Sequence, residues 1–184
     1  MRPAIVFGAI LLLVSVAFVL RRAPSIARRA SGGKSSDHVA RRNERVGPAW
    51  AYPDSIRTPG TTNPDISQAN IDETICNSGW STKLVRPKES YTAKLKVLQM
   101  REWGFSGRTS DYEEDHLISL ELGGHPTDAR NLWPEPYSPK PGAREKDVVE
   151  RYLHRQVCQG VLPLSEAQQQ IATDWYKVYV AIEK

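Results

Sequence analysis

The sequence predicts an α+β fold, in which a ββα unit is braced by additional helices and preceded by an apolar N-terminal helix. Residues 116–122 alternate apolar and polar side chains, and a second short extended segment is expected at residues 131–133, beyond a Gly-Gly pair. Residues 143–158 then carry apolar side chains at helical spacing. Residues 4–20 form a continuous apolar run without a charged side chain. Two strands around a turn followed by a helix give the order of a ββα unit.

The length of 184 residues suits one domain with appendages. We expect a membrane anchor or signal segment at residues 1–22, a disordered linker rich in Arg, Ser, Gly and Pro at 23–62, and a folded domain at 63–184. Residues 1–62 hold 10 basic and 3 acidic side chains, whereas residues 63–184 hold 15 and 18. The net charge of +4 therefore comes from the N-terminal part, and it is no evidence that the domain binds nucleic acid.

The apolar run of residues 4–20 is, at 17 residues, at the lower limit for a helix that spans a membrane. Arg21 and Arg22 follow it at once, with no small-x-small cleavage site, so an uncleaved anchor is favoured over a cleaved signal. The positive-inside tendency would place the domain in the cytoplasm. A disulfide would place it outside. We expect an extracytoplasmic, membrane-anchored domain, or a secreted one if the segment is cleaved.

Two cysteines, Cys76 and Cys158, lie near the two ends of the expected domain. No Cys-x-x-Cys or Cys-x-x-His spacing occurs, which argues against a structural zinc site. The pair is either two buried thiols or a disulfide. In the chain-entropy model a disulfide across such a long loop contributes roughly 4 kcal/mol.

A helix is expected between Ser90, a candidate N-cap, and Gly104, a candidate C-terminal stop. Its expected apolar face consists of Tyr91, Leu95 and Leu98. The opposite face is basic and carries Lys94, Lys96 and Arg101. This face is either merely solvated or the place where a phosphate backbone lies.

Two more helices are expected near the C-terminus. The first runs from Ala143 to Cys158, and the second opens at Pro163, with Ser165 and Gln168 as a capping box. The run of residues 134–142 contains four prolines and is expected to be irregular.

The residues that carry chemistry are Asp115, His116 and Asn131. A carboxylate is a hard oxygen ligand for Mg²⁺ or Mn²⁺. A histidine beside it can take a proton from water while the metal stabilises charge on a phosphate. An Asn amide can bind the metal or orient the histidine. Base, metal and orienting group are the minimum for hydrolysis of a phosphodiester.

The stretch Asp-His-Leu-Ile-x-Leu-Glu-Leu-Gly-Gly, followed by Asn-Leu-Trp-Pro-Glu, resembles the HNH endonucleases of the His-Me finger superfamily. The segment from Cys76 to Trp80, the helix from Ser90 and the C-terminal ending also resemble a bacterial group of HNH-nuclease-like proteins. The resemblance covers roughly residues 58–178. It implies a ββα-metal core.

By position, the resemblance implies that His116 is the general base, Asp115 a metal ligand and Asn131 the residue that positions the histidine or its loop. The sequence departs from the family where a helical His or Asn is usual. Asp147 or Glu145 would be the second protein ligand, and Asp147 is the residue we carry forward. The implied cofactor is Mg²⁺ or Mn²⁺, with Zn²⁺ or Ni²⁺ as alternatives. The candidate phosphate contacts are Lys94, Lys96, Arg101, Arg130 and Arg144.

The expected function is metal-dependent endonuclease activity, with DNA favoured over RNA as the partner. The first alternative is a catalytically inactive HNH-fold module at the cell envelope that binds nucleic acid or a protein. A second alternative is a structural envelope protein held rigid by its disulfide. The sequence shows no trace of sequence preference, biological role or an inhibitor.

Overall fold

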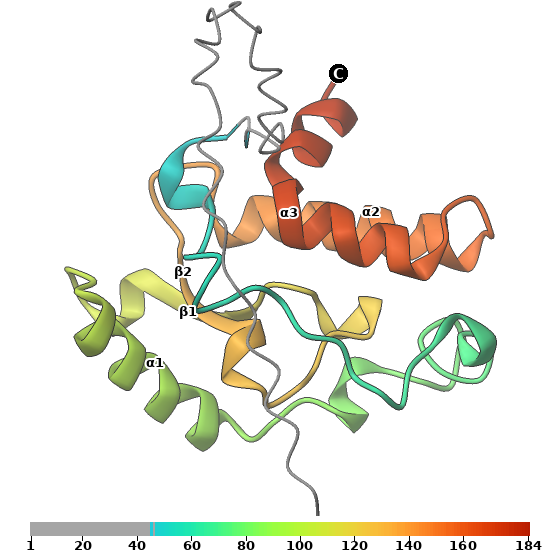
Figure 1. Cartoon of the computed structure of the whole chain (residues 1–184), viewed down its shortest axis with the longest axis horizontal. Helices are drawn as coiled ribbons and strands as arrows, with labels where there is room; N and C mark the ends of the chain where they lie inside the picture. The colour runs from blue at the N-terminus through green and yellow to red at the C-terminus, as the bar shows by residue number, and fades with distance from the viewer. Residues whose placement is uncertain (1–44, 46) are drawn as a thin grey trace, which may run out of the picture. The chain divides into compact units, whose positions relative to one another are not determined.

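The computed structural model describes Arg45 and residues 47–184 (Figure 1). Its main elements are helix α1 (Glu89–Trp103), strand β1 (Tyr112–His116), strand β2 (Leu132–Pro136), helix α2 (Ala143–Cys158) and helix α3 (Leu164–Ile182). Short 3₁₀ helices lie in the connections. The mixture of helices and a two-stranded sheet confirms the α+β class.

The two strands form an antiparallel hairpin, in which Asp115 pairs with Trp133 and His116 with Leu132. The strand predicted at residues 116–122 was wrong, because β1 ends at His116 and a 3₁₀ helix occupies Leu120–Leu122. The alternation of apolar and polar residues does not reflect alternating burial in this segment, because the intervening residues Leu117 and Ser119 are also buried, at 1% and 3% exposure. The chain after His116 is thus a buried loop rather than a half-exposed strand.

The Gly-Gly turn lies within this loop. Gly123 has φ of 70°, a backbone conformation that side chains disfavour. Gly124 is required for a different reason, because a Cβ atom there would lie 1.7 Å from the carbonyl oxygen of Ile118. The two glycines therefore let the loop fold back on itself against β2.

Helices α1 and α2 cover opposite faces of the hairpin (Figure 1). Successive strand side chains point to opposite faces, so His116 points toward α1 and Asp115 toward α2. On the α1 side, the Gln99 side chain donates a hydrogen bond to the Leu132 carbonyl, at 3.0 Å. On the α2 side, Lys146 bonds Asp115. Helix α3 packs beside α2, where Val149, Leu153, Val157, Ile171 and Trp175 form the centre of the core.

The predicted apolar face of α1 was wrong. Tyr91 and Leu98 are 38% and 40% exposed, whereas Gln99 and Met100 are buried. The orientation of the helix follows from its polar side chains, because Lys96 and Gln99 both donate to backbone carbonyls of the hairpin. Its N-cap residue is Lys88 rather than Ser90, and Gly104 ends it in the left-handed conformation, as expected.

Helix α2 occupies its predicted range, and α3 begins at Leu164, directly after the Pro163 at which the sequence predicts its opening. The capping box predicted at Ser165 is wrong, because the N-cap of α3 is Pro163. The Gln168 side chain instead donates to the carbonyl oxygen of Leu122, at 2.8 Å. It therefore ties α3 to the loop that follows β1.

The cysteines Cys76 and Cys158 are joined by a disulfide, with their Cα atoms 5.3 Å apart. This confirms the predicted bond and excludes the alternative of two free thiols. The bond links the segment before α1 to the end of α2.

The sequence assigns residues 47–62 to the linker, whereas in the structure part of this segment packs against the domain. Ala51 is 1% exposed, and its carbonyl accepts a hydrogen bond from the Trp175 indole at 2.6 Å. Thr62 forms a β-bridge with Gly124. The apolar run of residues 4–20 lies outside the described residues. Within the described part of the chain, no helix has both the length and the apolar character required to cross a membrane.

Candidate functional site

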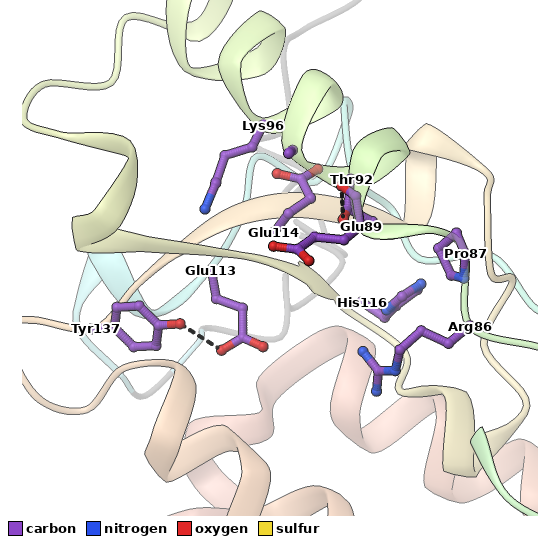
Figure 2. Close-up of a pocket in the computed structure, with 10 residues that line it drawn as sticks. Arg86, Pro87, Glu89, Thr92, Lys96, Glu113, Glu114, His116 and Tyr137 are labelled. Atoms are coloured by element: carbon purple, nitrogen blue, oxygen red, sulfur yellow. Dashed lines mark hydrogen bonds between the residues drawn. The ribbon is translucent and has the colours of Figure 1, made fainter. Parts of the chain in front are cut away.

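A pocket of about 360 Å³ lies between α1, β1 and the segment that precedes α1. Its lining combines one histidine, two basic side chains and three glutamates with one tyrosine and three small residues: Arg86, Pro87, Glu89, Thr92, Ala93, Lys96, Glu113, Glu114, His116 and Tyr137. Figure 2 shows His116 and Arg86 together at one end, and Glu113 with Tyr137 at the other. The pocket therefore brings the predicted base together with cationic side chains.

His116 is held in one orientation at the pocket wall. It is 3% exposed, and its Nε2 lies 3.0 Å from the carbonyl oxygen of Pro126. A carbonyl only accepts hydrogen bonds, so Nε2 carries the proton and Nδ1 keeps its lone pair. Within the described residues no protein group hydrogen bonds to Nδ1. Burial, aided by the Arg86 charge, lowers the pKa of His116, so the imidazole is neutral at pH 7 and suited to accept a proton.

Asn131 organises the loop that carries the Pro126 carbonyl. Its side chain is fully buried, accepts from the backbone N–H of Ile118 at 3.0 Å and donates to the Ile118 carbonyl at 3.0 Å. It also donates to the carbonyl of His125 at 3.1 Å, next to Pro126. A longer contact of 3.4 Å joins it to the N–H of Thr61. Asn131 therefore acts on the loop backbone, and through it on the ring of His116.

Asp115 faces away from the pocket, toward α2. Its Oδ2 accepts a hydrogen bond from the Lys146 ammonium at 2.7 Å. Lys146 has no exposed surface, and its ammonium also bonds the His116 carbonyl at 2.8 Å and a Glu150 carboxyl oxygen. A third carboxyl, that of Glu135, lies 3.8 Å away and is fully buried. One buried cation thus stands among three carboxyl groups.

The ionisation of this cluster follows from burial and from the lysine. Burial favours the neutral form of Asp115, but Lys146 outweighs it and brings the pKa down to about 2. Burial raises the pKa of Glu135 well above its usual value, and that of Glu150 to about 8. Lys146 loses hydration on burial, yet Asp115 and the glutamates raise its pKa well above the usual value. The cluster is therefore an ion pair of Lys146 and Asp115, flanked by two glutamates in which burial favours the neutral form.

This arrangement does not fit the metal ion expected at Asp115 and Asp147. A divalent cation bound to the Asp115 carboxylate would lie next to the Lys146 ammonium and would be repelled by its positive charge. Asp147 is half-buried, and burial together with the Asp115 charge raises its pKa. In residues 45 and 47–184, the group of three ligand side chains whose atoms lie within 4.8 Å of one another is Cys76, His154 and Cys158. Two of these three are joined in the disulfide and have no thiolate to offer.

The predicted phosphate contacts lie in several places. Lys96 lines the pocket and donates to the Tyr112 carbonyl at 2.9 Å. Arg144 lies over the Tyr137 ring, with 5.5 Å between its guanidinium carbon and the ring centroid, and so stands near the pocket. Arg130 pairs with Asp128 at 2.7 Å. Lys94 and Arg101 are exposed on α1 and outside the pocket lining.

Sequence reasoning missed Arg86, Glu135 and Lys146. Arg86 precedes a proline in an irregular segment, so no pattern marks it. Lys146 and Glu150 have the i, i+4 spacing of a helical ion pair, which was a usable signal. Glu135 lies between two prolines, and its burial follows only from the pairing of β2 with β1.

Comparison of the chain with protein-family models, curated proteins and solved structures finds no match. The likeness to HNH endonucleases therefore rests on the motif residues alone.

Proposed function

We propose that this protein hydrolyses phosphodiester bonds of nucleic acid, with His116 as the general base. One observation carries the proposal: the neutral His116 ring is fixed by the Pro126 carbonyl at the wall of a pocket that also holds Arg86 and Lys96. An oriented base beside cationic groups is what attack of water on a phosphodiester requires.

In the proposed reaction, Nδ1 of His116 takes a proton from a water molecule as the water oxygen bonds to phosphorus. The bond from phosphorus to one ester oxygen breaks, and that oxygen takes a proton from solvent. The charge on the phosphate is met by Arg86 and Lys96. Burial raises the pKa of Glu114 to about 8, so this wall of the pocket carries less negative charge at pH 7 than its residues suggest.

The test is nicking of supercoiled plasmid DNA by the full-length protein, with RNA as a second substrate. His116→Gln keeps an amide that can donate to Pro126 but has no basic nitrogen. We expect it to lose about 100-fold or more of the rate, the usual range for a general base. The matched control is His125→Asn, since an Asn oxygen can accept the backbone N–H bonds that His125 Nδ1 accepts from Thr127 and Asp128. We expect this variant to stay within a few-fold of the native rate.

Circular dichroism and thermal unfolding would establish that both variants are folded. Cleavage by folded His116→Gln at the native rate would refute the assignment of the base. Absence of cleavage by the native protein with Mg²⁺, Mn²⁺, Zn²⁺ or Ni²⁺ and without metal would refute hydrolysis altogether. The predicted dependence on a metal, the anchor and the cellular location stay predictions.

The Lys146–Asp115 pair favours a second candidate, the inactive module that binds nucleic acid. In such a module the pocket would bind a phosphate without turnover. Fluorescence anisotropy with labelled DNA separates the two candidates: a binding module keeps native affinity in His116→Gln and cleaves in neither form. Arg86→Gln should weaken binding under both candidates.

A further inference from the structure

The ammonium of Lys146 lies between helix α2 and strand β1. It extends from the first turn of α2 to Asp115, the two places where the sequence led us to expect metal ligands. Its three short contacts go to a carboxylate of β1, a backbone carbonyl of β1 and a carboxyl group of α2. An ammonium has three hydrogens, so these contacts use all of its donors.

The groups around Lys146 are those that hard divalent cations prefer. Carboxylate and carbonyl oxygens bind Mg²⁺ and Mn²⁺, and here Asp115, Glu135, Glu150 and the His116 carbonyl converge on a single positive charge. The charge belongs to a side chain that is 0% exposed. It is covalently attached, so neither dilution nor a chelator can remove it.

We propose that the Lys146 ammonium takes the place that a divalent cation would occupy beside Asp115, so that this oxygen cluster binds no metal and the reaction at His116 proceeds without one there. The second half of this statement rests on the proposed function, whereas the first half concerns cation binding alone.

Lys146 is a positioning residue in this proposal, since it is buried and out of reach of a substrate. It binds the side chain of Asp115 and the carbonyl of His116 at once, and so fixes the end of β1 from behind. His116 is then held on both sides, through its carbonyl by Lys146 and through its ring by Pro126. The charge of a bound phosphate is left to Arg86 and Lys96 on the pocket side of the strand.

The first experiment measures Mn²⁺ binding to the full-length protein, from the loss of the free-ion signal in electron paramagnetic resonance. Lys146→Met keeps an unbranched side chain without the charge. We expect it to gain a saturable Mn²⁺ site that the native protein lacks and that the double variant Lys146→Met/Asp115→Asn loses again. The control is Lys140→Met, which removes a lysine that is 80% exposed and pairs with Glu145. It should gain no site.

Two results would overturn the proposal. One is Mn²⁺ binding by the native protein that Asp115→Asn abolishes. The other is a folded Lys146→Met variant that gains no Mn²⁺ site. If Lys146→Met does not fold, Lys146→Met/Glu150→Gln, which replaces one of the buried carboxyl groups by a neutral amide, takes its place. The measurement on the native protein decides the proposal in either case.

The second experiment measures plasmid nicking in excess EDTA. Cleavage at an undiminished rate supports the proposal, and cleavage that requires added metal and is lost in Asp115→Asn overturns it. Lys146→Met should lower the rate and shift the pH at which it is half-maximal, because the backbone that carries His116 is no longer held. If the native protein cleaves nothing under any condition, the proposed function fails, while the Mn²⁺ measurement still tests whether Lys146 excludes a cation.

Discussion

Replacement of Asn131 by alanine would remove the side chain on which the loop after β1 depends. Three of its hydrogen bonds are 3.0 to 3.1 Å long and all are to backbone groups, with a weaker fourth at 3.4 Å. Each bond contributes about 0.5–1.5 kcal/mol net, and a buried partner left unpaired costs more. We therefore expect Asn131→Ala to lower the free energy of unfolding by about 3–5 kcal/mol. An ordinary domain has a free energy of unfolding of roughly 5–15 kcal/mol, so this loss would be a large part of the total.

Urea unfolding followed by far-ultraviolet circular dichroism would measure this loss. The matched control is Asn77→Ala, an exposed asparagine whose side chain bonds the backbone of Asp72 and Gly79 within its own turn. We expect a loss of about 1 kcal/mol or less there. A loss of under about 1 kcal/mol for Asn131→Ala, or equal losses in the two variants, would refute the reasoning.

Asn131→Asp sharpens the same test, because it keeps the shape and the accepting oxygen but removes both donated bonds. Its carboxylate would face the carbonyl oxygens of Ile118 and His125. We expect a loss of about 2 kcal/mol or more at pH 7, and a smaller loss near pH 4, where a protonated carboxyl can donate one bond. A loss that does not change with pH would contradict the assigned donors.

Further predictions concern the loop glycine, one buried glutamate and the disulfide. Gly124→Ala should lower the free energy of unfolding by about 3 kcal/mol or more. Gly104→Ala makes the same substitution in open space and should lower it by about 1 kcal/mol. Urea unfolding of the two variants compares these losses. Burial raises the pKa of Glu114 from its ordinary value of 4.5 to about 8 in the folded protein, so the contribution of its protonated form to stability is present below pH 4.5 and lost as pH rises through 8. Glu114→Gln should therefore raise stability by about 1–3 kcal/mol at pH 8 and change it little at pH 4, and a gain at pH 4 alone would contradict the burial argument. Cys76→Ser/Cys158→Ser should lower stability by about 3–5 kcal/mol, and dithiothreitol should reproduce that loss in the native protein but have no effect on the variant.

The helices near the C-terminus and the glycine turn could be predicted because local rules decide them. Helix α2 has its apolar residues at helical spacing, and the proline-rich run before it places its beginning. The positive φ of Gly123 likewise follows from the residue type. The orientation of α1 could not be predicted in this way, because Lys96 and Gln99 are drawn to backbone carbonyls of a hairpin distant in sequence.

Three residues of the candidate site were predictable from the sequence, whereas their contacts and their cationic neighbours were not. The sequence indicated Asp115, His116 and Asn131, and the structure places the first two at the end of β1 and Asn131 directly before β2. It could not indicate that Asp115 and His116 point to opposite helices, with Lys146 on one side and Arg86 on the other. That separation depends on where β1 ends, and the alternation of residues 116–122 misplaced this end.

The disulfide has a consequence for how the protein withstands proteases. All residues that line the pocket, and Lys146 with its carboxyl partners, fall between Cys76 and Cys158 in the chain. A protease that cuts once in this stretch, for instance at the exposed residues 138–140, leaves two pieces still joined through the sulfur atoms. The nicked molecule keeps every group of the site in one covalent assembly, and only reduction of the bond allows the pieces to separate.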